Sequence, residues 1–116
     1  MLNPVFDQLL DEMRALHARK NQDYASDTNP FSNFEEAAEE AGVEVADVFA
    51  VLIGIKNARI RELERSGKTP QNESLMDSYL DRCMYVALDL AYRRQQIADE
   101  AAHEAWVDTH GYGCGV

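Results

Sequence analysis

The amino-acid sequence predicts an all-α fold, and three observations lead to that prediction. Helix-forming residues dominate the 116-residue chain, which has only 6 glycines and 3 prolines. Apolar residues recur at helical spacing in four separate segments. Hydrophobic residues make up 46% of the chain, enough for the core of one domain. We therefore expect residues 1–108 to form a single domain, a four-helix bundle whose C-terminal helix is long. Residues 109–116 are expected to form a flexible or partner-docked tail.

The first two helices are expected on either side of the loop sequence ASDTNPF. The first covers about residues 4–24, because Asn3 is a suitable N-cap and a proline follows it at the first helical position. The second begins at Ser32, since Ser32 and Glu35 have the spacing of a capping box. Gly42 is expected to end this short helix.

The last two helices are longer. The third is expected over about residues 44–65, where seven apolar residues recur at helical spacing, and Gly67 is its expected C-cap. The fourth begins near Asn72 and extends past Arg94 to about Val107. No internal repeat or long linker divides the chain.

Charge and cysteine content narrow the classes of function. The formal net charge is -10, which argues against general binding to a nucleic-acid backbone. A small anionic ligand remains possible where cations converge, and an acidic chain can hold a divalent cation. The two cysteines have no zinc-site spacing, and the N-terminus lacks the apolar core of a signal peptide. We therefore expect a cytoplasmic protein that does not span a membrane.

Charged residues occupy positions where a helical wheel expects core residues. Lys20 falls in the middle of the apolar arc of the first helix, and Lys56 in that of the third, with Arg59 nearby. On the fourth helix, Asp77 and Asp81 share a face with apolar residues one turn further on. An unpaired buried charge costs several kcal/mol. These residues must therefore pair with one another or line a pocket.

Two structural readings and one functional reading follow from these charges. The first structural reading is an ion-pair network between helices, and the second is snorkelling of long cationic side chains to the surface. The functional reading is a cleft in which Asp77 and Asp81 share a cation such as Mg²⁺. Glu73 would extend this acidic row, and Glu35 and Glu39 could reach the same cleft. The three cations would then contact phosphate oxygens.

The same residues carry a resemblance to a known family. The series KNQDYA, NPFSNF, KNARI and NESLMDSYLDRCMYVALDL resembles the phage and bacterial nucleotide-modification-associated domain family, over roughly residues 10–95. Members open with K-x-x-D-Y and close with D-x-x-x-D-x-x-x-Y on the last long helix. The resemblance implies that Asp23, Tyr24 and Tyr85 contact the ligand. Asn33 is either a capping residue or a further ligand contact.

This family is in turn similar, more loosely, to the MazG-like all-α nucleoside triphosphate pyrophosphatases. Those enzymes bind Mg²⁺ through E-E-x-x-E on one helix and E-x-x-D on the next. Literal matches occur at residues 35–39 and 44–47, but the gap between them is short and the second match lies outside the apolar arc. The counterpart of the second motif is therefore Glu73, Asp77 and Asp81, which departs from the family pattern.

Three functions remain open. The first is Mg²⁺-dependent hydrolysis of a nucleoside triphosphate, with acidic residues holding the metal and Lys20, Lys56 and Arg59 stabilising developing charge. The second is a module that binds or sequesters a nucleotide without turnover. The third is a structural or interaction protein. The two long helices, and the resemblance to oligomeric MazG-like proteins, also predict a homo-oligomer, such as a homodimer.

Overall fold

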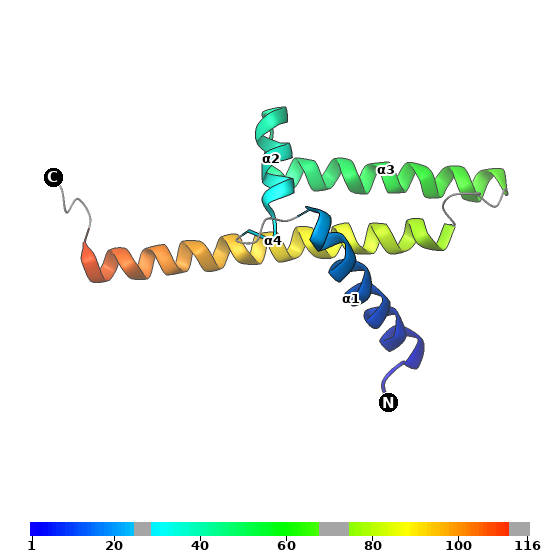
Figure 1. Cartoon of the computed structure of the whole chain (residues 1–116), viewed down its shortest axis with the longest axis horizontal. Coiled ribbons are helices and arrows are strands. Elements are labelled where there is room, and N and C mark those ends of the chain that lie inside the picture. The colour runs from blue at the N-terminus through cyan, green and yellow to red at the C-terminus, as the bar shows by residue number, and fades with distance from the viewer. Residues whose placement is uncertain (25–28, 68–74, 112–116) are drawn as a thin grey trace.

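The computed structural model describes residues 1–24, 29–67 and 75–111, and gives the side chains of all of these except 21–24. This part of the chain forms α1 (Pro4–Tyr24), α2 (Ser32–Ala41), α3 (Val45–Ser66) and α4 (Leu75–His110), and contains no strand. The predicted all-α class is therefore confirmed. Figure 1 shows α3 and α4 lying side by side and antiparallel, with α2 standing across the start of α3 and α1 crossing the middle of α4.

Local capping explains where three helix ends lie. The Asn3 side chain accepts hydrogen bonds from the backbone N–H groups of Val5 and Phe6, at 3.0 and 3.1 Å, and so caps α1 as predicted. Gly42 and Gly67 follow α2 and α3 with φ of 70° and 64°. Only glycine adopts this left-handed conformation at no steric cost, which is why both helices end there.

The capping box predicted at the start of α2 is wrong. Phe31 is the N-cap, no side chain caps the helix, and Ser32 lies inside it. Glu35 instead accepts a hydrogen bond from the Asn29 side chain at 2.8 Å. The turn at 29–31 fixes this helix start, because the backbone N–H groups of residues 34 and 35 bond to the Phe31 carbonyl.

A capping box does occur at the start of α3. The Glu44 backbone N–H donates to the Asp47 carboxylate at 3.0 Å, and the Glu44 side chain accepts from the backbone of Asp47. These two residues are the literal E-x-x-D match in the sequence. Their capping role explains why this motif lies outside the apolar arc of the helix.

The core lies where α2 meets α3. Phe49 is fully buried, and its ring centroid lies 4.7 Å from that of Phe34, whose exposed fraction is 8%. Ala38 and Val45 complete this buried cluster. Tyr92 of α4 packs against it, and burial, followed by the nearby carboxylates of Glu35 and Glu44, raises the pKa of its phenol.

The chain is open rather than closed into a bundle. Its radius of gyration is 18.7 Å, whereas a compact chain of this length has about 13 Å. Leu16, in the second half of α1, is buried, but Val5 and Phe6 in the first half are 75% and 56% exposed. Figure 1 shows that this first half projects away from the other helices.

Two further predictions concern the C-terminal tail and membrane-spanning helices. The tail predicted over residues 109–116 lies outside the described residues from position 112, while Thr109 and His110 still belong to α4. Across the described ranges, no helix combines the length and the apolar character that crossing a membrane requires.

Candidate functional site

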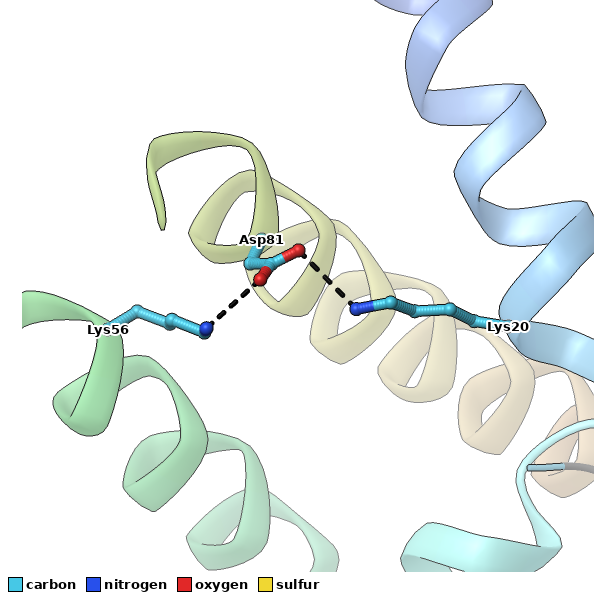
Figure 2. A network of polar contacts seen from close by, with 3 residues as sticks. All are labelled: Lys20, Lys56 and Asp81. Atoms are coloured by element: carbon cyan, nitrogen blue, oxygen red, sulfur yellow. Dashed lines mark hydrogen bonds and ion pairs between the residues drawn. The ribbon is translucent and has the colours of Figure 1, made fainter. Parts of the chain in front are cut away.

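Three of the predicted inward charges meet in one cluster, which we call the Lys–Asp–Lys cluster. Its members are Lys20 of α1, Lys56 of α3 and Asp81 of α4. One carboxylate oxygen of Asp81 lies 3.4 Å from the Lys20 ammonium, and the other lies 3.0 Å from the Lys56 ammonium, as Figure 2 shows. The Asp81 and Lys56 side chains are 18% and 17% exposed, and that of Lys20 is 35% exposed. The cluster therefore links three helices at a partly buried point.

The sequence brings these charges together through helix packing. Lys20 and Lys56 lie on the packed faces of α1 and α3, and both faces meet α4 at Asp81. A second polar contact joins the next residue of each helix. Arg82 of α4 donates a hydrogen bond to the side-chain oxygen of Asn57 of α3, at 3.0 Å. Polar groups inside a helix interface are retained only where they satisfy one another. Both links thus fix how α4 is placed against its neighbours.

Replacing Asp81 by alanine is expected to lower the free energy of unfolding by about 2 kcal/mol, because it removes the carboxylate that both ammonium groups contact. This loss is smaller than the loss caused by breaking a fully buried ion pair, because Lys20 is partly exposed to water. Urea unfolding followed by circular dichroism measures the change. Asp11→Ala is the matched control, because the side chain of its partner Arg14 is 77% exposed. Loss of this exposed ion pair should lower the free energy of unfolding by at most about 0.5 kcal/mol. Equal effects of the two substitutions would contradict a stabilising role of the cluster.

A groove of about 500 Å³ lies next to the cluster, between α1 and α4. Its lining is mostly apolar and includes Met13 of α1, and Met84 and Leu88 of α4. Phe31 and Phe34 also line it, as do Lys20 and Asp81. The groove therefore combines an apolar surface with one edge of the Lys–Asp–Lys cluster.

The wall that α1 contributes to this groove carries two cations, Arg14 and Lys20, beside the apolar Leu10 and Met13. Arg14, His17 and Lys20 line it and recur every three residues, so they lie along one side of the helix. Asp81 is the single carboxylate among the described residues of the lining. The whole chain, in contrast, has 21 acidic and 11 basic residues. The groove is thus the place where this acidic protein presents cations to an apolar cavity.

Four further predicted site residues lie outside the Lys–Asp–Lys cluster. Tyr85 lines the groove one turn after Asp81. Arg59 and Asp77 are exposed. Asn33 is exposed as well, and within the described side chains it takes no part in capping α2.

The acidic residues proposed as metal ligands do not gather in the described part of the chain. Glu39 is exposed, and Glu35 is hydrogen-bonded to Asn29. Glu73 lies outside the described residues, as do the side chains of the predicted ligand contacts Asp23 and Tyr24.

The groove residues that the sequence did not single out as site residues include Arg14, His17, Phe31 and Phe34. The first two could have been found from their spacing, because Arg14, His17 and Lys20 recur every three residues and so lie on one side of the helix. The two phenylalanines carry no such signal, because their pattern is that of ordinary core residues.

The residues present do not by themselves fit a magnesium ion. Both carboxylate oxygens of Asp81 contact ammonium groups, which would repel a divalent cation at the same oxygens. Within residues 1–24, 29–67 and 75–111, no three histidine, cysteine or acidic side chains are grouped as a metal site requires. Mg²⁺ binding therefore remains a proposal that depends on Asp77, Asp81 and Glu73.

Comparisons with known proteins give no further guide to the site. Neither a protein-family model, nor a curated protein, nor a solved structure matches this chain. The geometry of the groove and the cluster is thus the basis for any assignment of function.

Proposed function

We propose that the chain is a nucleotide-binding protein and that the groove between α1 and α4 is the binding site. The observation that carries this proposal is an apolar cavity edged by Arg14 and Lys20 in a chain of net charge -10. A nucleotide has the matching chemistry, since it joins a flat, mostly apolar base to a strongly anionic phosphate group. The base would lie against Phe31 and Phe34, and the phosphates would lie near Arg14 and Lys20 of α1.

Lys20 is the residue best suited to contact a phosphate. Its ammonium lies 3.4 Å from Asp81, against 3.0 Å for Lys56, and its side chain is about twice as exposed. Charge-assisted hydrogen bonds are strongest at shorter distances, so Lys20 can leave Asp81 at the lower cost. Lys56 would then continue to neutralise the carboxylate while Lys20 turns to the ligand.

Isothermal titration calorimetry with a nucleoside, its monophosphate and its triphosphate tests this proposal. Affinity is expected to rise with the number of phosphates and to persist in EDTA, since the cations belong to the protein. Lys20→Ala should weaken triphosphate binding about tenfold, because one charge-assisted contact is worth about 1.5 kcal/mol. Arg19→Ala is the matched control, as this neighbouring exposed cation does not line the groove. Absence of binding across purine and pyrimidine triphosphates would refute the assignment.

Mg²⁺-dependent release of pyrophosphate from a nucleoside triphosphate is a second candidate function. It rests on Asp77 and Asp81, which lie one turn apart on α4, and it requires Asp81 to exchange its contacts with Lys20 and Lys56 for the cation. In this reading Lys20, Lys56 and Arg59 stabilise negative charge on the phosphates. The enzyme would release pyrophosphate only with a divalent cation, and Asp77→Ala would abolish release while triphosphate binding persists. Binding without release over a panel of deoxynucleotides would leave sequestration as the function.

The other expectations drawn from the sequence are also kept as proposals. They include a MazG-like arrangement of the helices, a role in phage-type nucleotide metabolism and a cytoplasmic location. A purely structural role for the Lys–Asp–Lys cluster is the competing reading, and it predicts no change in thermal stability with any nucleotide. A homo-oligomer, such as a homodimer, is also proposed.

A further inference from the structure

A second cavity, which we call the polar pocket, adjoins the groove between α1 and α4. It has a volume of about 420 Å³ and shares Pro30 and Phe31 with the groove. Its described lining consists of Asn29, Pro30, Phe31, Glu35, Tyr92, Gln95, Gln96 and Asp99. The groove is lined mostly by apolar side chains, whereas five of these eight residues are amides or carboxylates. The two neighbouring cavities therefore suit different parts of a ligand.

The polar pocket is electronegative. Glu35 and Asp99 line it, and its described lining contains no lysine, arginine or histidine. Burial raises the pKa of the Tyr92 phenol, and three nearby carboxylates raise it further, as negative charges around one acidic group do. These carboxylates belong to Glu35, Glu44 and Asp99. The polar pocket therefore disfavours phosphate and favours a group that donates hydrogen bonds.

The charges of the two cavities give a bound nucleotide one direction. On α4 the groove is lined from Asp81, which contacts Lys20, to Ala91, a distance of about 15 Å along the helix. The polar pocket continues from Tyr92 onward. A nucleotide whose phosphates lie at Lys20 thus directs its base toward Phe31, where the two cavities meet.

Glu35 is held at this meeting point. It lies one helical turn after Phe31, whose carbonyl accepts the hydrogen bond of the Glu35 backbone N–H. The Asn29 side chain donates to the Glu35 carboxylate at 2.8 Å and accepts from the Phe31 backbone N–H at 2.9 Å. A carboxylate has about four acceptor positions, so Glu35 keeps acceptor capacity for a ligand. Glu35 is also partly buried, whereas Asp99 is exposed.

We propose, on the basis of the nucleotide-binding assignment above, that the groove takes guanine nucleotides and that Glu35 reads the base. The carboxylate accepts hydrogen bonds from the N1–H and the 2-amino group of guanine, which are two adjacent donors on one edge of the base. Adenine and cytosine place an acceptor nitrogen beside their amino group. Uracil places a carbonyl oxygen on each side of its N3–H. Each of these three bases would set an acceptor against the carboxylate, which is unfavourable.

Calorimetry with GTP, ATP, CTP, UTP and inosine triphosphate, each in EDTA, tests this assignment. GTP is expected to bind at least about tenfold more tightly than ATP, CTP or UTP, because hydrogen bonds to a charged group are the stronger ones. Inosine triphosphate lacks only the 2-amino group of guanine, so its affinity should fall between those of GTP and ATP. This series changes the base and leaves the protein and the phosphates as they are.

Glu35→Gln tests the residue that reads the base. Glutamine keeps the shape of the side chain and an oxygen for Asn29, but it replaces one acceptor by a donor. We expect the affinity for GTP to fall about tenfold and that for ATP to be unchanged, so that the preference is lost. Glu36→Gln is the matched control, because this exposed neighbour carries the same charge and lines neither cavity.

The outcomes separate this inference from the nucleotide site itself. Equal affinity for all the triphosphates, or a preference for another base, would overturn the guanine assignment while the groove remains a nucleotide site. A preference for GTP that persists in Glu35→Gln would overturn the role of Glu35. Absence of binding by every triphosphate would refute the nucleotide site, and the guanine assignment with it.

Discussion

Replacing Ala91 by tryptophan is expected to lower the affinity for a nucleoside triphosphate about 100-fold, or about 2.7 kcal/mol. Ala91 lines the groove from α4 and is exposed, so the indole would occupy space that the ligand needs without displacing a core residue. The substitution leaves every charge of the groove in place. Loss of binding would therefore report on the cavity itself rather than on its electrostatics.

Ala98→Trp is the matched control for this experiment. Ala98 lies two turns further along the same side of α4 and is exposed, but it does not line the groove. It should bind the triphosphate as the wild-type chain does, with equal helical content by circular dichroism. Equal affinity of wild-type protein and Ala91→Trp would place the ligand outside the groove.

The second large effect concerns stability. Phe49→Ala is expected to lower the free energy of unfolding by about 4 kcal/mol, because a fully buried aromatic ring is removed from the cluster that joins α2 to α3. Phe34 contacts this ring and also lines the groove, so the same substitution should weaken nucleotide binding. Urea unfolding by circular dichroism gives the first quantity, and calorimetry gives the second.

Val51→Ala provides the comparison for this prediction. It lies two residues further on the same helix but is 61% exposed, and its replacement should change the free energy of unfolding by less than about 0.5 kcal/mol. A loss of less than about 1 kcal/mol for Phe49→Ala would mean that the α2–α3 contact does not hold the domain together.

The helices could be predicted because their signals are local. Asn3, Gly42 and Gly67 end or begin helices through the properties of one residue and its nearest backbone groups. The start of α2 could not be predicted in the same way. There, a turn around Phe31 competes with the capping box that the sequence suggests, and only the folded backbone decides between them.

Part of the candidate site could also be predicted, because helical periodicity indicates which charges point inward. Lys20, Lys56 and Asp81 do meet, as their places on the wheels suggest. Arg59 and Asp77 share the periodicity but are exposed, because a wheel does not show how far a neighbouring helix covers each face. The groove itself arises from the crossing of α1 over α4, which no local pattern encodes.

Helix α4 contacts α1 and α3 through two neighbouring sides. The side that faces α1 lines the proposed nucleotide groove, and the adjacent side packs on α3, with Asp81 between them in contact with both. The Lys–Asp–Lys cluster then has two roles. It fixes three helices relative to one another, and it supplies Lys20 at the edge of the groove.

Nitrogen-15 heteronuclear NMR of the full chain, titrated with a nucleoside triphosphate in EDTA, tests the central claim most directly. We predict amide shifts that cluster at residues 13–20 of α1, 30–34 before and within α2, and 81–91 of α4, the segments that line the groove. The segment 61–65 at the end of α3, which contributes no residue to the groove lining, should remain unchanged. A spectrum unaffected by saturating triphosphate, or shifts confined to residues outside the groove, would contradict the proposed site.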